Sequence, residues 1–416
     1  MSLPLLSVLA FALAIGLSCF TPVNVGFTSI ALAFLVGVVF GGMKVGEVAA
    51  GFPAGLFLIL VGVTLLFSQA GVNGTLEKVA RRSVRLARGN LGMIPIIFFA
   101  LASALATIGA GNIATTALLA PIAMAVAGKV GISAFLMTVM VATGANTGAL
   151  SPFAPTGVIA NGIQARIGIT GVQWPTFYNN FIAQAFVAFA GYFALGGLRL
   201  FGRGRAALDE FLSEDQQPFD GKQKLTLAVI AALIVGVVFF RVDVGMGAFL
   251  AAGVLTLARA SNEEAAVKAM PWNMIVMVSG VTVLIALLEK TGGMDLFTSI
   301  LARFSTPTTV TAVVAFVTGL VSVYSSSSGV VLPAFLPMIP GLIQRLGGGD
   351  PVALASTINV SAHLVDVSPL STLGALCIAS APATEDRAKL FNKLLAWGLS
   401  MSVVGAIVCF VFFGLL

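Results

Sequence analysis

Charged side chains are scarce in this sequence. Asp, Glu, Lys and Arg make up only 9% of the 416 residues, whereas 58% of the residues are hydrophobic. Because a soluble domain carries about 25% charged residues, this composition excludes a soluble globular protein and predicts a membrane protein. A spanning helix needs about 20 apolar residues, so the length allows about ten to twelve membrane crossings.

Cysteine is also rare, and Cys19, Cys377 and Cys409 are too scattered for a metal site or a disulfide framework. We expect them to be small apolar residues between packed helices. The formal net charge is +6, which basic cytoplasmic loops explain in a membrane protein, so no nucleic-acid partner is expected. Residues 1–20 are apolar without a preceding basic region, which favours a first span over a cleaved signal peptide.

Two apolar segments are interrupted by residues that a simple membrane helix does not contain. Residues 144–157 read GANTGALSPFAPTG, and residues 361–374 read SAHLVDVSPLSTLG. The segments align at one uniform offset, which places Ser151-Pro152 on Ser368-Pro369. One broken helix that occurs twice indicates a protein built from two related halves.

Two further apolar stretches are too long for one span and polar in their middle. The first, about 92–128, contains Gly109-Ala110-Gly111-Asn112, and the second, about 308–344, contains Ser325-Ser326-Ser327-Ser328-Gly329. Two half-helices that meet at a tip explain this pattern, so we predict a re-entrant hairpin in each half. Gly62-Val63-Thr64 also aligns with Gly280-Val281-Thr282, which extends the repeat beyond the broken segments.

Each half thus contains three spans, a hairpin, a broken span and a final span. Because five crossings are an odd number, the second half must be inserted upside down, as in the inverted repeats of secondary transporters. We therefore predict an all-α polytopic membrane protein with two inverted repeats, each with about five transmembrane helices (one broken) plus a re-entrant hairpin. The boundaries are 1–200 for the first repeat (broken helix about 132–165), 201–224 for a cytoplasmic linker, and 225–416 for the second repeat (broken helix about 351–380).

The basic residues orient this arrangement in the membrane. If the loop at 78–88 is cytoplasmic and the crossings alternate, most of the 22 Lys and Arg residues fall on the cytoplasmic side, as the positive-inside rule requires. Both termini are then external. We expect a multi-pass protein of the inner (plasma) membrane.

The four interruptions are the places where a binding site is expected. Unwound backbone at membrane depth is tolerated only inside protein or against a watery cavity. Free N–H groups at helix starts attract anions, and free carbonyls at helix ends attract cations. The side chains there are neutral hydroxyls and amides, which suit Na⁺ and a carboxylate. Every Lys and Arg lies in a loop or at a membrane edge, so bound cations and helix N-termini must supply the positive potential.

His363 is the only histidine, and Asp366 is the only acidic residue placed inside a span. Three residues apart on a helical turn, they share a face. Ionisable residues inside a membrane are functional candidates, so one reading is a proton or cation site. The other reading is a buried pair whose members satisfy each other and nearby backbone groups. The first half has Asn146 and Ala149 at the aligned positions, so any proton role is asymmetric.

These motifs resemble the ion transporter superfamily, in particular the divalent anion:sodium symporters and the MatC-type dicarboxylate carriers. The symporters carry Ser-Asn-Thr at each hairpin tip, where this chain has Gly111-Asn112-Ile113 and Ser327-Ser328-Gly329. Their broken helices carry a Thr-Pro-Pro type turn, where this chain has the 151–156 and 368–372 turns. The short Gly/Ser-Pro-rich turns are closer to the MatC type.

The resemblance implies a site and a mechanism. It implies Na⁺ as the coupling ion with no other cofactor, a small dicarboxylate anion as substrate, elevator-like movement within the lipid bilayer, and a homodimer. The implied substrate-binding residues are Asn112, Thr115, Ser151, Pro152, Thr156, Ser328, Ser368, Pro369, Ser371 and Thr372. The implied Na⁺-binding residues are Gly111, Asn112, Gly144, Asn146, Thr147, Gly148, Ser327, Ser328, Ser361, Ala362 and His363, with His363 and Asp366 as a possible proton site.

Three functions remain open at this stage. The first is a secondary active transporter of small dicarboxylates (malonate, malate or succinate) coupled to Na⁺ or H⁺, which is not an enzyme. The second is a cation/proton antiporter or metalloid anion exporter on the same fold, which a single buried acid disfavours. The third is an intramembrane serine hydrolase that uses His363 with one of residues 325–328. It needs a nucleophile in reach of its base, and no Gly-x-Ser-x-Gly motif surrounds these serines.

Overall fold

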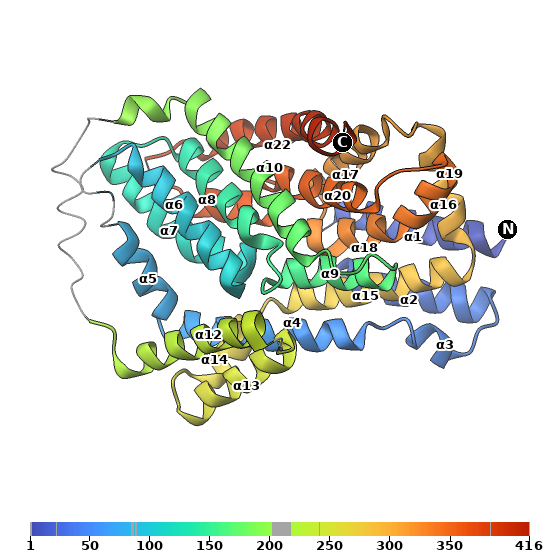
Figure 1. The fold of residues 1–416 in the computed structure, drawn as a ribbon, viewed down its shortest axis with the longest axis horizontal. Coiled ribbons are helices and arrows are strands. Elements are labelled where there is room, and N and C mark those ends of the chain that lie inside the picture. The colour runs from blue at the N-terminus through green and yellow to red at the C-terminus, as the bar shows by residue number, and fades with distance from the viewer. Residues whose placement is uncertain are drawn as a thin grey trace.

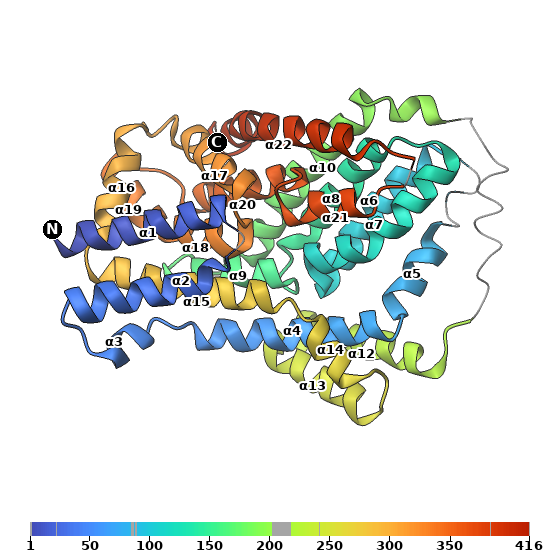
Figure 2. The same cartoon turned by 180° about the vertical axis from the view of Figure 1, so that it is seen from behind.

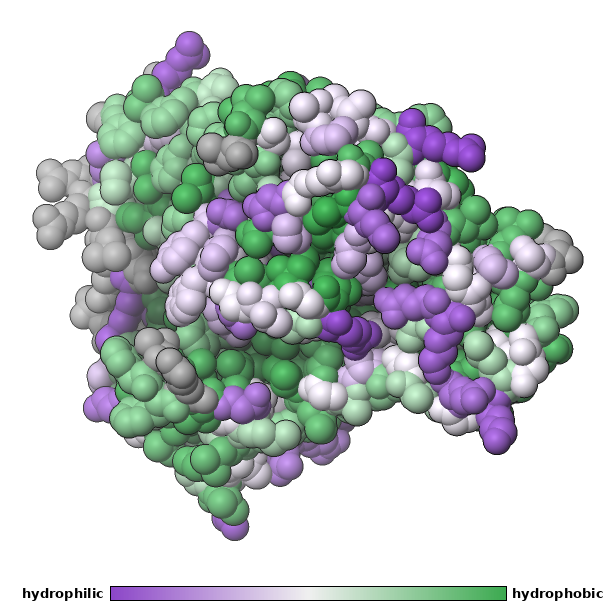
Figure 3. Space-filling view, turned by 45° about the vertical axis from the view of Figure 1, so that its right-hand side comes forward, coloured by the Kyte–Doolittle hydropathy of each residue, from purple (hydrophilic) through white to green (hydrophobic). Residues whose placement is uncertain are grey.

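The computed structural model describes residues 2–21, 23–84, 87, 90–201, 218–240, 242–382 and 384–415. Helices, without strands, make up the regular structure of these residues. Six of their helices are long and apolar enough to cross a membrane, and shorter apolar helices accompany them. The predicted all-α polytopic membrane fold is therefore confirmed. Apolar residues cover much of the face in Figure 3, as expected for a surface in lipid.

The first half of the chain folds into the elements expected from the interrupted pattern. They are α1 (Leu3–Phe20), α2 (Val25–Phe34), η1 (Leu35–Phe40), α3 (Val45–Ala49), α4 (Ala54–Val72), α5 (Thr75–Val84), α6 (Met93–Leu105), η3 (Ala106–Ala110), α7 (Gly111–Val130), α8 (Ala134–Ala149), α9 (Pro155–Arg166), α10 (Gln173–Ala194) and η4 (Gly197–Leu200).

The second half repeats this order. Its elements are α12 (Gly221–Phe240), α13 (Val244–Leu257), α14 (Glu263–Ala269), α15 (Trp272–Lys290), α16 (Gly293–Arg303), α17 (Val310–Tyr324), η5 (Ser327–Val331), α18 (Leu332–Phe335), η6 (Leu336–Met338), α19 (Ile339–Leu346), α20 (Pro351–Leu364), η7 (Val365–Val367), α21 (Thr372–Ala379), α22 (Arg387–Cys409) and η8 (Phe410–Gly414). The opposite orientation of the two halves in the membrane remains a prediction. Most of the predicted linker, residues 202–217, lies outside the described residues, and α12 already begins at Gly221.

Each half contributes a helix to the other half's packing. Helix α2 packs against α15, and α13 packs against α4. A Cβ atom on Gly62 would lie 2.7 Å from the Gly245 carbonyl oxygen, and one on Gly280 would overlap the Gly26 carbonyl. The aligned glycines at 62 and 280 therefore allow two helix backbones to approach closely, as small residues do in membranes.

The two long interrupted stretches fold back on themselves at their polar centres. In the first, Gly109 and Gly111 have φ values of 124° and 74°, which favour glycine, and both α6 and α7 pack against α8. In the second, Ser325 and Ser326 are extended between α17 and η5. The returning arm of the second hairpin is divided into short helices, because Pro333, Pro337 and Pro340 each lack the N–H that a continuous helix uses.

Both broken helices also form where the sequence predicted them. Helix α8 ends at Ala149 and α9 begins at Pro155, while α20 and η7 end at Val367 and α21 begins at Thr372. Gly157 and Gly374 occupy matching places, because a Cβ on either would overlap the carbonyl of the serine six residues earlier. Glycine at these positions lets the second half-helix turn back tightly against the break.

The helices form two groups that face each other. Figures 1 and 2 show α2, α4 and α12–α15 along one side of the molecule, and α6–α8, α10, α17, α20 and α22 along the other. Helices α4 and α15 contact the hairpin tips, through η3 and η5 respectively. The tips and breaks therefore meet in the middle of the molecule, between the two groups.

Candidate functional site

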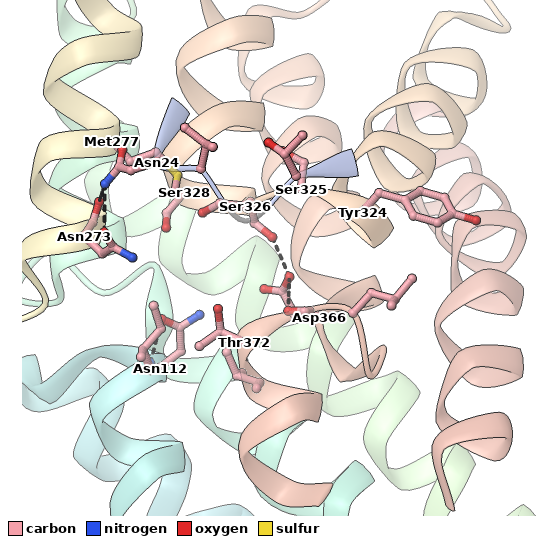
Figure 4. A pocket seen from close by; sticks show the side chains of 17 residues that line it. Asn24, Asn112, Asn273, Met277, Tyr324, Ser325, Ser326, Ser328, Asp366 and Thr372 are labelled. Carbon is pink, nitrogen blue, oxygen red and sulfur yellow. Dashed lines mark hydrogen bonds between the residues drawn. The ribbon is translucent and has the colours of Figure 1, made fainter. Parts of the chain in front are cut away.

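A polar cavity of about 200 Å³ lies where the hairpin tips and the second break converge (Figure 4). The tips contribute Asn112 and Ser325–Ser328, and the segment around η7 and α21 contributes Asp366, Ser371 and Thr372. The remaining wall comes from the starts of α2 and α15. The lining residues are Thr21, Val23, Asn24, Asn112, Ile113, Asn273, Met277, Tyr324, Ser325, Ser326, Ser327, Ser328, Asp366, Leu370, Ser371, Thr372 and Leu373.

Neutral donors dominate this polar cavity. Its wall is made mainly of serine and threonine hydroxyls and asparagine amides, and among the described residues no Lys or Arg lines it. The start of α21 adds backbone N–H groups that have no partner within the helix, since Ser371 provides no side-chain cap. Such a wall binds an anion through hydrogen bonds and helix dipoles.

Asp366 is the one charged residue of the polar cavity's wall, and its side chain is buried. Its Oδ1 atom accepts hydrogen bonds from the Ser327 hydroxyl at 2.5 Å and the Ser371 hydroxyl at 3.3 Å. Its Oδ2 atom accepts a long hydrogen bond from the Asn146 amide, at 3.4 Å. A buried carboxyl with only neutral partners is costly in its charged form unless a proton or a cation neutralises it.

Asn146 joins the two halves of the molecule. It is fully buried in α8, and its Oδ1 accepts a 2.8 Å bond from the Asn112 amide at the first tip. Its own amide donates to the His363 carbonyl oxygen at 2.7 Å as well as to Asp366. Asn180 of α10 donates to the Asn146 backbone carbonyl at 2.8 Å. A continuous polar chain thus runs from the first tip to the second break.

Oxygen atoms cluster beside Asp366 at the second tip. The Ser322 and Ser327 hydroxyls lie 2.7 Å apart, and they lie 2.9 Å and 3.0 Å from the Ala362 carbonyl oxygen. With the Asp366 carboxyl, these groups supply two hydroxyls, one carbonyl and one carboxylate. Hard cations such as Na⁺ prefer oxygen ligands of this kind, and a shared proton suits them equally. No group of three or more His, Cys, Asp or Glu residues suited to a metal occurs in the described part of the chain.

A second cavity, of about 470 Å³, adjoins the polar cavity at Asn112 and Ile113. Its wall is mostly apolar and comes from α4, α7, the start of α9, and the segment before α15. Gly111 and Thr156 belong to this wall. The first tip therefore separates a small polar space from a larger apolar one.

Several predicted site residues line these two cavities. Asn112, Ser327, Ser328, Asp366, Ser371 and Thr372 line the polar cavity, and Gly111, Asn112 and Thr156 line the apolar cavity.

Other predicted residues do not line these two cavities, and most of them form hydrogen bonds with groups that lie next to them in the fold. Ser151 donates to the Thr107 carbonyl at 2.6 Å, Thr147 donates to the Thr143 carbonyl at 2.7 Å, and Ser361 pairs with Thr318 at 2.6 Å. Ser368 accepts from the Leu370 N–H at 3.3 Å, and the buried Thr115 hydroxyl has no partner in the described residues. Pro152 lines a different cavity, and Pro369 lines none of the cavities described.

Two predicted sodium ligands, Gly144 and Gly148, are contact points between helices. A Cβ on Gly144 would lie 2.6 Å from the Phe99 carbonyl oxygen, and one on Gly148 would overlap the Ser103 carbonyl. They let α8 pack directly on α6, which leaves Asn146 as the residue of this segment that faces the centre.

His363 does not bond to Asp366 among the contacts of the described residues. Its Nδ1 atom lies 2.7 Å from the Asn359 carbonyl oxygen, which identifies Nδ1 as the protonated nitrogen in the neutral ring. Its Nε2 atom is buried and has no partner in the described residues. The described contacts thus give His363 a backbone partner and a neighbour, Asn146, that it shares with Asp366, rather than a direct hydrogen bond to Asp366.

Four polar residues at or next to the site were not predicted from the sequence: Asn24, Asn273, Ser322 and Asn180. Asn24 caps α2 and donates to the carbonyl and side-chain oxygens of Asn273, at 2.9 Å each, at the wall of the polar cavity. Each is a polar residue at a helix start or inside an apolar helix, and such residues are too common to single out without a partner in view.

Residues 1–149 match the family described as Dicarboxylate carrier protein MatC N-terminus, which confirms the resemblance to MatC-type carriers for that part of the chain. No curated protein sequence matches the chain.

Two solved structures share the fold. The YdaH transporter of Alcanivorax borkumensis is 17% identical, with a TM-score of 0.53 over 89% of this chain and 87% of that one. MtrF of Neisseria gonorrhoeae, described with a class of antimetabolite efflux pumps, is 14% identical, with a TM-score of 0.56 over 99% and 95%. The two structures show the fold, and the matched family is one of carriers, which indicates a multi-pass membrane transporter and not an enzyme.

Proposed function

We propose that this transporter carries small dicarboxylate anions of the malonate, malate and succinate class, coupled to the movement of a cation. The observation that carries the proposal is the polar cavity, which combines many neutral donors with one buried carboxyl and no lysine or arginine among its described lining residues. The family match over residues 1–149 supports the same substrate class.

The size of the polar cavity fits this substrate class. An engineered cavity of about 150 Å³ holds one benzene molecule, and this cavity measures about 200 Å³. A dicarboxylate with three or four carbons is slightly larger than benzene. Asn112, Ser328 and Thr372 come from three different elements around the space, which supports the proposal that they bind carboxylate oxygens at both ends of such a molecule.

The carboxyl of Asp366 makes coupling necessary. Two like unit charges about 4 Å apart near a protein surface repel by roughly 4 kcal/mol, and burial strengthens the repulsion. A dianion therefore enters readily only after Asp366 is neutralised by H⁺ or by Na⁺ in the oxygen cluster of Ser322, Ser327 and Ala362. The cation and the anion then stabilise each other's binding, which is the energetic basis of symport.

Movement of the site follows from the arrangement of the helices. In this proposal the chain consists of two inverted repeats, and the hairpins with the broken helices move as one body against the remaining spans. Two copies pair through the static spans in the plasma membrane, with the termini outside. Helices α4 and α15, which touch the tips, form the surface along which the site slides.

Uptake into proteoliposomes tests the proposal. Labelled malonate or succinate is expected to accumulate only when an inward H⁺ or Na⁺ gradient is imposed, and the two gradients applied separately identify the ion. Protein-free liposomes provide the control. Uptake that is independent of both gradients would contradict the proposed coupling. The absence of uptake of any dicarboxylate would contradict the proposed substrate class.

A cation/proton antiporter is the second candidate, because a buried acid next to a hydroxyl cluster also suits alternate binding of H⁺ and Na⁺. Transport measurements with the same proteoliposomes distinguish the antiporter from the carrier. Exchange of Na⁺ for H⁺ without any dicarboxylate present would favour the antiporter over the carrier.

Replacing Asn112 with Leu is expected to weaken dicarboxylate binding by about tenfold or more. The substitution removes a donor at the junction of the two cavities and leaves the buried Asn146 oxygen unpaired, and a hydrogen bond to a charged group contributes about 1.5–3 kcal/mol. Thermal-shift titration of the purified protein measures the change. Asn161→Leu, on α9 and outside both cavities, is the matched control, and equal affinities for the two variants would contradict the assignment of Asn112.

A further inference from the structure

The apolar cavity of about 470 Å³ is not needed by the small dicarboxylates proposed above, although it is more than twice as large as the polar cavity. No Asp, Glu, Lys or Arg lines it among the described residues. Water in such a space has few hydrogen-bond partners, whereas an apolar group gains free energy when it moves there from bulk water. The apolar cavity is therefore suited to the apolar part of a ligand.

The two cavities adjoin at the first hairpin tip. Asn112 and Ile113 line both of them. The start of α15 also borders both, since Asn273 and Met277 line the polar cavity and Met274 lines the apolar one. In Figure 4, Asn112 lies across the polar cavity from the serines of the second tip. A ligand that is bound to Asn112 in the polar cavity therefore lies next to the apolar cavity.

Small side chains leave space in the apolar cavity. On α7, Ala114, Ala117 and Leu118 share one helical face and line the cavity, and both alanines are exposed. On α4, Gly71 and Val72 line it as well. Nothing lies within 4 Å of a Cβ atom built on Gly71. A larger side chain at 117 or 72 would therefore occupy part of this space.

The volume and the wall limit the group that can bind here. An engineered cavity of about 150 Å³ holds one benzene molecule, and the apolar cavity is about three times as large. An alkyl chain of about four to six carbons is no larger than benzene by a wide margin, so it fits. A charged group is disfavoured, because a buried charge without a partner is costly. The group is therefore an uncharged apolar chain.

We propose that the apolar cavity is a subsite for the apolar branch of a dicarboxylate, so that the transporter prefers dicarboxylates that carry an alkyl chain. This inference rests on the proposed function, in which Asn112, Ser328 and Thr372 bind the carboxylates in the polar cavity. The chain starts at a carbon between the carboxylates, passes Asn112 and Ile113, and lies between α7 and α4. Each methylene group buried there strengthens binding by up to about fourfold.

Thermal-shift titration of the purified wild-type protein tests the subsite. 2-Butylmalonate is expected to bind about tenfold more tightly than malonate or better, because its four-carbon chain leaves water. It is also expected to compete with labelled malonate for uptake into proteoliposomes at correspondingly lower concentrations. Hexanoate has the same carbon chain with one carboxylate fewer. It is expected to bind about tenfold or more weakly than 2-butylmalonate, because it lacks the second charged group for the polar cavity.

Variants that fill the apolar cavity separate the contribution of the chain from that of the carboxylates. Ala117→Leu on α7 and Val72→Phe on α4 are each expected to weaken 2-butylmalonate binding by about tenfold or more, and to leave malonate binding within a few-fold of wild type. Ala125→Leu is the matched control for α7, since Ala125 is exposed on the same helix and lines neither cavity. It is expected to leave both affinities unchanged. Because the two filling variants lie on different helices, misfolding of one leaves the test intact.

The outcomes separate this inference from the proposed function. A wild-type protein that binds no dicarboxylate would overturn both. Binding of malonate together with weaker binding of 2-butylmalonate would overturn the subsite alone, as would hexanoate that binds as tightly as 2-butylmalonate. Folded filling variants that bind 2-butylmalonate like the wild type would place the chain elsewhere and also overturn the subsite. Equal losses of malonate and 2-butylmalonate binding in both variants would have the same consequence.

Discussion

Replacing Asp366 with Asn is expected to reduce gradient-driven dicarboxylate uptake by a hundredfold or more. The amide imitates a permanently neutral carboxyl, so the site accepts the dianion but no longer gains or loses a cation during the cycle. Ser327 retains an oxygen to which it donates. Without a titrating group, the gradient cannot drive net uptake. Exchange of one dicarboxylate for another does not require a titrating group, so it is expected to continue.

The pH dependence of binding provides the second measurement for this variant. In the wild-type protein without Na⁺, a dianion binds only where Asp366 is protonated, so affinity is expected to fall as the pH rises through the range in which succinate stays fully ionised. In the Asp366→Asn protein affinity is expected to stay flat over that range. Ser371→Ala, which removes only the 3.3 Å bond, serves as control and keeps the wild-type slope. A sloping profile in Asp366→Asn would place the coupling group elsewhere.

Replacing Gly280 with Val is expected to prevent stable folding. A Cβ at this position would overlap the Gly26 carbonyl group, which is backbone and not a flexible side chain. Relief requires α2 and α15 to separate along their contact, so the cost exceeds the 1–3 kcal/mol that is typical of an overpacked core. Size-exclusion profiles and melting temperatures of the detergent-purified protein measure the loss.

Gly253 provides the matched control for this change. It lies in α13, and nothing lies within 4 Å of a Cβ built there. Gly253→Val is expected to retain the wild-type profile and a melting temperature within a few degrees. A Gly280→Val protein that melts like Gly253→Val would show that the two helices are not in close contact in the folded protein.

Much of the fold was predictable because the lipid imposes simple rules on sequence. Long apolar runs must be helices, so a run with Gly, Asn or Pro in its centre had to be a break or a tip. This located the tips near Asn112 and Ser327 and the breaks near Ser151 and Ser368 within a few residues. The division of the second returning arm into short helices was not predicted, although Pro333, Pro337 and Pro340 contained the signal.

The site was predictable only in part. Asn112, Ser328, Asp366 and Thr372 line the polar cavity, and they were predicted as site residues because they lie at interruptions, where unpaired backbone favours a binding site. Asn24, Asn273 and Ser322 were missed because a polar residue at a helix start or inside a helix has many roles. Gly144 and Gly148 stay predicted sodium ligands, and in the structure their lack of side chains allows α8 to contact α6.

The sequence by itself determined the membrane class, the helical content, the four interruptions and the asymmetry that leaves His363 and Asp366 in the second half only. These properties depend on composition and on the spacing of residues along one helix. Only the tertiary structure decided which interruptions meet. Asn146 bonds to Asp366 across more than two hundred residues of chain, and Asn180 of α10 donates to the Asn146 backbone carbonyl of α8. Such pairings depend on how helices pack against one another, and the periodicity of one helix does not indicate which other helix it contacts.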